Sequence, residues 1–129
     1  MTKVEILFSM AIDGENGTVF QTNGSFSNGL INFIDPEGFS YTVEFEPNSV
    51  RIKRIGKTTM DLTFKPKITT EGLLTVDGMT FKFTVMTHVL QISTDKILIN
   101  YDMIESGSVL SHHQMLIKWI HNGRNVKND

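Results

Sequence analysis

Apolar and polar residues alternate with a period of two along most of this chain. Successive side chains of a β-strand point to opposite faces of the sheet, so this period is typical of strands with one buried face. Apolar residues occupy every second position, or nearly so, in residues 4–12, 39–45, 60–64, 79–85, 97–103 and 109–119. The 3.6-residue period of an amphipathic helix is not found along the chain. The pattern therefore predicts an all-β protein.

Residues that favour turns fall at short intervals between these predicted strands. The turn signals are Asp13-Gly14, Asn23-Gly24, Asn28-Gly29, Asp35-Pro36-Glu37-Gly38, Glu46-Pro47-Asn48, Gly56, Lys65-Pro66, Glu71-Gly72, Asp77-Gly78 and Ser106-Gly107. Short connections between consecutive strands give an up-and-down order, and closure into a barrel removes exposed strand edges. We therefore predict an antiparallel up-and-down barrel of nine or ten strands in one domain, residues 1–121, followed by a frayed tail, residues 122–129.

Composition narrows the classes of function. The chain has 129 residues, of which 40% are apolar and 20% charged, and these values are typical of one folded domain. The net charge of −2 provides no basic face for phosphate contacts, so we expect no nucleic-acid partner. The absence of cysteine excludes disulfides and thiolate catalysis. No apolar run has the length of a membrane helix or a secretion signal, so we expect a cytoplasmic protein without membrane insertion.

A resemblance to a known family rests on short motifs between Val50 and Ile120. The motifs are Arg54-Ile55-Gly56, Met60-Asp61-Leu62-Thr63-Phe64, Thr75 with Gly78, Val85-Met86-Thr87 and Ile97-Leu98-Ile99-Asn100-Tyr101, preceded less distinctly by Gly24-Ser25-Phe26. On these residues the chain resembles the YwiB-like family of small bacterial proteins. The resemblance implies a calycin-type (lipocalin-like) β-barrel, and it implies no activity because the family is uncharacterised.

The chain departs from the pattern of that family at two places. Phe33-Ile34-Asp35 stands where such proteins often carry Tyr-Glu in the third strand. Leu73, Val76 and Asp77 replace the aromatic and proline neighbours expected around Thr75. No role for a hydroxyl or a carboxylate is therefore carried over to these positions.

Polar residues that share the inward phase of the strands are candidate ligand-binding residues. The candidates are Tyr41, Arg54, Thr87, Tyr101, Ser111 and His113. A barrel of this size is either filled by its own side chains or holds one small ligand. One guanidinium, a few hydroxyls and an apolar wall would suit a small, partly apolar ligand with an anionic head. In the alternative, Arg54 reaches solvent at the barrel mouth and the tyrosines are packed core rings.

Methionine is frequent on the same inward phase. The inward methionines are Met10, Met60, Met79, Met103 and Met115. Unbranched thioethers fill irregular gaps in a core and also line adaptable lipid-binding surfaces. Both interpretations remain open from the sequence.

The pair His112-His113 suggests a metal site at first sight. Neighbouring residues of a strand point to opposite faces, so the two rings cannot bind one ion, and we predict neither a metal nor a cofactor. The sequence also lacks a nucleophile beside a base, paired carboxylates and a phosphate-binding glycine loop. We therefore predict that the protein is not an enzyme. For a site assembled from distant strands, Arg54, Tyr101 and His113 are the first candidates.

The outward phase of the last strands is unusually apolar. The apolar residues on this face are Leu98, Ile104, Leu110, Leu116 and Ile120. Apolar residues on both faces of a strand imply a cover, and we expect a homodimer through this region. Three functions remain open: a binding barrel, an interaction or scaffold protein that acts through its outer face, and an enzyme with a strand-assembled site.

Overall fold

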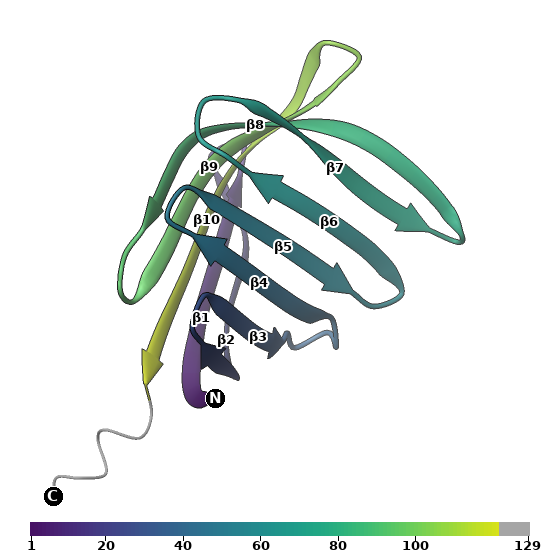
Figure 1. Ribbon diagram of the computed structural model, residues 1–129. Coiled ribbons are helices and arrows are strands. Elements are labelled where there is room, and N and C mark those ends of the chain that lie inside the picture. The colour runs from purple at the N-terminus through teal and green to yellow at the C-terminus, as the bar shows by residue number, and fades with distance from the viewer. Residues whose placement is uncertain (122–129) are drawn as a thin grey trace, which may run out of the picture.

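The computed structural model describes residues 1–121, and the predicted tail lies outside the described residues. The ten strands are β1 Thr2–Ile12, β2 Glu15–Ser27, β3 Leu30–Ile34, β4 Ser40–Glu46, β5 Ser49–Ile55, β6 Thr58–Phe64, β7 Thr69–Val76, β8 Met79–Ile92, β9 Lys96–Glu105 and β10 Ser108–His121. Each strand pairs antiparallel with the next, and β1 pairs with β10 to close the barrel (Figure 1). The predicted all-β, up-and-down barrel is confirmed, with ten strands. Among residues 1–121, no helix is long and apolar enough to cross a membrane.

The barrel has two ends that differ in how well they are covered. We call the end that carries the β1–β2, β3–β4, β5–β6, β7–β8 and β9–β10 turns the open end, and the opposite end the closed end. Inward side chains towards the closed end, such as Ile6, Phe64 and Trp119, are fully or almost fully buried. Inward side chains towards the open end, such as Met60 and Met103, are only partly buried. The core therefore fills the closed half and is less covered in the open half.

Three register shifts interrupt the alternation within long strands, and the first lies between β1 and β2 at Met10 and Ala11. The register of β8 against β9 shifts between Thr87 and Val89, and the register of β10 against β9 shifts between Val109 and Ser111. Each bulge adds one residue to one strand, so the inside and outside positions change over beyond it. The prediction that Val109 points inward is wrong for this reason: it pairs with the outward Ile104 and is 51% exposed.

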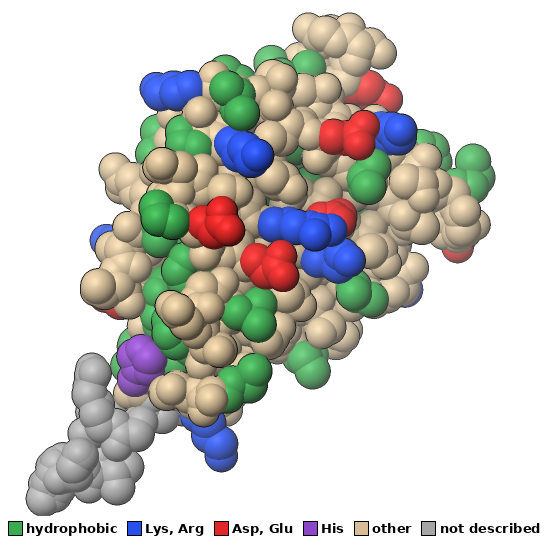
Figure 2. Space-filling view, in the orientation of Figure 1, with side chains coloured by type: hydrophobic (Ala, Val, Ile, Leu, Met, Phe, Trp, Pro, Cys, Tyr) green, Lys and Arg blue, Asp and Glu red, His purple; other side chains and the backbone are tan. Residues whose placement is uncertain are grey.

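The β7–β8 hairpin projects beyond the neighbouring strands at the right of Figure 1. Phe81 pairs with Leu74, and Met79 pairs with Val76, on the inward face of this hairpin. Their predicted burial is wrong, because Phe81 is 50% and Met79 is 62% exposed. The alternation gives the face correctly, but no strand lies opposite the projecting tip. Figure 2 shows hydrophobic side chains at the surface over this hairpin.

The outer face of β4, β5 and β6 carries a cross-strand charge ladder, visible as mixed acidic and basic side chains at the centre of Figure 2. Glu44 of β4 pairs in register with Arg51 of β5. Arg51 donates two hydrogen bonds to Asp61 of β6, at 3.0 and 2.7 Å. This bidentate pair holds the pKa of Asp61 below its ordinary value. The ladder fixes the register of the short strands. Arg54 lies on the opposite, inner face of β5.

Candidate functional site

The predicted ligand-binding residues lie on the inward face of five strands. Tyr41 of β4 and Arg54 of β5 are cross-strand partners. Tyr101 of β9 pairs with Thr87 of β8 on one side and with His113 of β10 on the other. Tyr41 and Arg54 are close enough to Tyr101 to influence the pKa of its hydroxyl. The structure therefore gathers these side chains inside one barrel, as two groups on facing walls.

Arg54 is the main residue of the group on the first wall, which it forms with Tyr41. Its guanidinium carbon lies 4.5 Å from the centroid of the Phe39 ring, which is a cation–π contact. Its Nε atom is buried without a hydrogen-bond partner, and Arg54 forms no salt bridge within residues 1–121. Burial raises the pKa of the neighbouring Tyr41 above 10.0, and the charge of Arg54 opposes this shift. The half-buried cation thus lacks a carboxylate partner, although buried charges in proteins are usually paired.

The second wall consists of β8, β9 and β10, and its main side chains are the rings of Tyr101 and His113. They stack with centroids 4.7 Å apart and planes 11° apart. His113 Nε2 and Ser111 Oγ share a hydrogen bond of 2.7 Å, whereas His113 Nδ1 is buried without a partner. Burial lowers the pKa of His113 below 6.5 and raises the pKa of Tyr101 well above its ordinary value.

Ser111 and His113, both predicted as inward ligand-binding residues, form a hydroxyl–imidazole pair. The prediction that no nucleophile lies beside a base is wrong, because residues two apart in a strand share a face. No carboxylate binds His113 Nδ1 within residues 1–121, so no acid orients the ring as in a catalytic triad. The pair is a hydrogen-bonded group that lines the interior.

Thr87 completes the second wall. Its side chain is fully buried, with 0% of the residue exposed, and its Oγ1 atom has no hydrogen-bond partner. Together with Arg54 Nε and His113 Nδ1, it gives three unpaired polar atoms among the six candidate residues. Each unpaired buried polar atom costs about 1–3 kcal/mol, and a folded protein keeps few of them. These three atoms are therefore unpaired polar groups on the inner wall of the described barrel.

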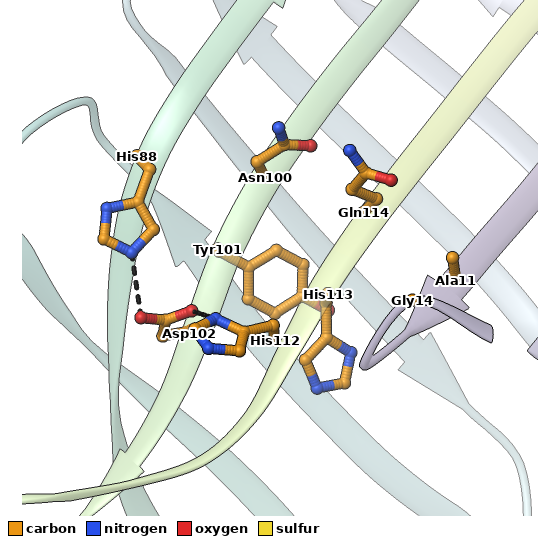
Figure 3. Close-up of a pocket in the computed structure, with 9 residues that line it drawn as sticks. All are labelled: Ala11, Gly14, His88, Asn100, Tyr101, Asp102, His112, His113 and Gln114. Atoms are coloured by element: carbon orange, nitrogen blue, oxygen red, sulfur yellow. Dashed lines mark hydrogen bonds and ion pairs between the residues drawn. The ribbon is translucent and has the colours of Figure 1, made fainter.

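A second group of polar residues lies on the outer face of β8, β9 and β10 (Figure 3). Asp102 accepts hydrogen bonds from His88 Nε2, at 2.8 Å, and from His112 Nδ1, since an ionised carboxylate only accepts. Burial of Asp102 raises the pKa of its carboxyl group, but the two histidine hydrogen bonds outweigh this and hold the pKa below 3.8. Only the cross-strand register and the bulge at His88 bring these residues together, so no sequence pattern indicates the cluster.

The outer cluster borders a pocket of about 270 Å³. The pocket is lined by Ala11, Gly14, His88, Asn100, Tyr101, Asp102, His112, His113 and Gln114. This volume is below the roughly 300–1,000 Å³ of typical ligand sites. The two imidazoles bind different oxygens of Asp102, and no group of three or more His, Cys, Asp or Glu side chains is arranged to hold a metal ion among residues 1–121. The pocket is therefore smaller than a typical ligand site and is not arranged to hold a metal ion.

The predicted interface residues form two separate groups on the outer face. Leu98 and Leu116 are cross-strand partners towards the closed end, with Ile120 further along β10. Ile104 and Leu110 lie near the open end, and Leu110 is the extra residue of the β10 bulge. Two rows of polar residues, Asn100 with Gln114 and Asp102 with His112, lie between the groups. A dimer would therefore not bury all five residues in one continuous apolar patch.

The fold and the interior define a small ten-stranded antiparallel barrel with an unpaired cation on its inner wall. The chain belongs to the family described as "Domain of unknown function (DUF1934)", whose model matches residues 9–117. It is also similar to the crystal structure of the YwiB protein from Bacillus subtilis, with a TM-score of 0.72 and 20% identity over 94% of this chain and 92% of that chain. The resemblance to the YwiB-like family is confirmed, and at this identity the structural likeness shows the fold alone. A search of the curated proteins found no match.

Proposed function

We propose that this protein is a non-enzymatic, cytoplasmic binding barrel for a small, partly apolar ligand with an anionic head. Arg54 is the observation that carries the proposal. Arg54 lies on the inward phase of β5 between Tyr41 and Met60. Its guanidinium is stacked on Phe39 and has no carboxylate partner in the described residues. Removal of a charge from water is costly unless an opposite charge replaces the water, so the site favours an anion. A carboxylate or phosphate head fits the planar fork of a guanidinium.

The apolar part of the ligand would lie among the partly buried side chains of the open half. Met10, Met60 and Met103 are partly buried there and pack against the core. Methionine side chains are unbranched and flexible, so they adapt to an incoming alkyl chain at small cost in packing. Phe81 and Met79 on the projecting hairpin extend this apolar wall towards solvent.

A titration with a fluorescent fatty acid, dansyl-undecanoic acid, tests the proposal. We expect saturable binding to the natural protein and a loss of about tenfold or more in affinity for Arg54→Ala, because a charge-assisted pair is removed. Arg51→Ala is the matched control, since Arg51 lies on the same strand and points outward. Equal affinity of the natural protein and Arg54→Ala, or no saturable binding, would reject the proposal.

A second function, as an interaction protein that associates through its outer face, is supported by the neighbouring Leu98 and Leu116. Outward leucines side by side on two strands favour a cover, and a second copy of the chain is the simplest one. Sedimentation of the natural protein and of Leu116→Glu tests this. A dimer that dissociates in the variant supports it, and a monomer of about 15 kDa in both samples excludes it.

The incomplete hydroxyl–imidazole pair supports the non-enzymatic part of the proposal. Ser111 and His113 are hydrogen bonded, but burial disfavours the protonated imidazolium that a general base must become. A screen with nitrophenyl esters tests this part. Turnover that disappears in Ser111→Ala would show an enzyme and reject it.

A further inference from the structure

The projecting β7–β8 hairpin has one free strand edge (Figure 1). On one edge, β8 pairs with β7 from Met79 to Met86. On the other edge, β8 pairs with β9 only from Thr84 onward, where Thr84 faces Ile104. Within residues 1–121, Met79–Phe83 therefore has no backbone partner on that edge. A free edge presents unpaired N–H and C=O groups and is a template for another strand.

The turn of the hairpin determines which backbone groups point to this edge. Asp77 and Gly78 have positive φ angles of 52° and 78°, as in a two-residue type I′ turn. The residues that flank such a turn are joined by a backbone hydrogen bond, so Val76 and Met79 form a hydrogen-bonded pair. Hydrogen-bonded and non-hydrogen-bonded pairs alternate along antiparallel strands.

The next pair along the hairpin, Thr75 with Thr80, is therefore not hydrogen bonded through its backbone. Side chains lie closer in pairs of this kind, and the hydroxyl oxygens of Thr75 and Thr80 are 3.0 Å apart. Residues in such pairs direct their N–H and C=O away from the partner strand. Thr80 and, two residues on, Lys82 thus direct theirs to the free edge.

The inner face of the same hairpin carries an exposed apolar row. Met79 is 62% and Phe81 is 50% exposed, and Phe83 continues the row to the core, against which it packs. Thr80 and Lys82 alternate with these residues and point to the opposite face. An apolar row beside a free backbone edge marks a surface for pairing with another strand.

We propose that this edge pairs with the same edge of a second copy of the chain, antiparallel about a two-fold axis at Phe81. The order of residue types from Met79 to Phe83 is apolar, polar, apolar, polar, apolar, which is symmetric about Phe81. In this register Phe81 faces Phe81 of the second copy, Met79 faces Phe83, and Thr80 faces Lys82. The two-fold closes the assembly at a dimer.

Each cross-strand pair of this register agrees with the geometry of the edge. Thr80 and Lys82 exchange backbone hydrogen bonds, since theirs are the groups that point to the edge. Phe81 meets its copy in a non-hydrogen-bonded pair, where side chains lie closest, and methionine packs well against the ring of Phe83.

Charge favours this register over its neighbour. Lys82 is the single charged residue of Met79–Phe83, and it lies 3.9 Å from Glu71 of β7. In the proposed register Lys82 faces a threonine. A shift of the register by one residue in each copy would place Lys82 opposite itself, and like charges directly opposite are destabilising.

Cysteine cross-linking tests the register, because the natural chain contains no cysteine. Phe81→Cys places two cysteines in a pair whose Cα atoms are about 4.5 Å apart, a separation that a disulfide bridges. We expect a covalent dimer under mild oxidation, formed about tenfold faster or more than in the control Ile68→Cys. Ile68 is equally exposed (53% against 50%) but lies at the closed end.

Sedimentation of charge variants tests the two-fold symmetry. The natural chain at rising concentration should reach twice the 14.6 kDa of one chain. Phe81→Lys and Phe81→Glu should each remain monomeric because like charges face each other, whereas an equal mixture of the two should dimerise again. Urea unfolding checks that each variant is folded. Leu116→Glu should leave this dimer intact, which distinguishes it from a dimer through Leu98 and Leu116.

Three results would overturn the inference. A natural chain that stays monomeric up to roughly 1 mM pairs with no second copy, and its edge is then left to a strand of another protein. Equal cross-linking of Phe81→Cys and Ile68→Cys excludes the register. A dimer that persists in Phe81→Lys but dissociates in Leu116→Glu places the contact on the other outer surface. The fatty-acid titration with Arg54→Ala tests the binding barrel independently of all three.

Discussion

Replacement of Thr87 by valine should make this protein more stable. Thr87 is fully buried, and its Oγ1 atom has no hydrogen-bond partner in the described residues. An unpaired buried hydroxyl costs about 1–3 kcal/mol, and a methyl group in the same space adds favourable apolar burial. Valine has the same branched shape and suits a strand equally well. We expect the free energy of unfolding to rise by about 1–2 kcal/mol and Tm to rise by roughly 3–8 °C.

Thr70→Val is the matched control for this experiment. Thr70 lies on the adjacent strand β7, and its Oγ1 donates a hydrogen bond to the carbonyl oxygen of Thr63. The same chemical change should therefore lower the free energy of unfolding by about 1 kcal/mol. Urea unfolding followed by tryptophan fluorescence measures both variants, and equal m-values would show that the unfolded state is unchanged.

The result also bears on function. If the hydroxyl of Thr87 is kept for a ligand, Thr87→Val should bind dansyl-undecanoic acid about fivefold more weakly while being more stable. A Thr87→Val protein that is less stable than the natural chain, with Thr70→Val destabilised as expected, would refute the reasoning. That outcome would show that the hydroxyl is already paired inside the barrel.

Three further predictions concern the fold and its pH dependence. Gly24→Ala should lower the free energy of unfolding by about 3 kcal/mol, because the new Cβ would lie 2.5 Å from the Asn32 carbonyl oxygen. Gly17→Ala in the same strand is the control, since its Cβ meets only ordinary contacts and the variant should fold normally in the same urea assay. Burial lowers the pKa of His113 below 6.5, so the unfolded chain binds a proton first and the urea midpoint should fall as the pH decreases through 6.5; an equal slope in His113→Gln would contradict this. The pKa of Asp102 is below 3.8, so its stabilising contribution is present above that pH and is lost as the pH falls through the pKa of the folded state. Asp102→Asn should therefore be less stable than the natural chain at pH 7, and this deficit should shrink in strong acid.

The sequence alone determined the strands, their order and the face of most side chains. Successive side chains of a strand alternate between its two faces, so the direction of each follows from whether its position is odd or even, which we call its parity. This alternation is a local property of the backbone. Eight of the ten predicted turn signals mark hairpins, whereas Asn23-Gly24 and Glu71-Gly72 are wrong because they lie inside β2 and β7, where cross-strand pairing holds the backbone extended. The short hairpins left an up-and-down order as the simplest topology. Arg54, Thr87 and Tyr101 could be assigned to the interior from this parity alone, and the structure shows Thr87 and Tyr101 buried there.

Only the tertiary structure decided what those side chains meet. The bulges at His88 and Leu110 interrupt the parity, and the sequence carried no signal for either. The exposure of Phe81 depends on how far one hairpin extends past its neighbours, and the contact of His88 with Asp102 depends on cross-strand register. The missing partner of Arg54 likewise appears only when every strand around it is in place. The direction of a side chain relative to the sheet is set by neighbouring residues in the chain. Its contacts and burial are set by residues distant in sequence, and the periodicity of the sequence carries no information about those distant residues.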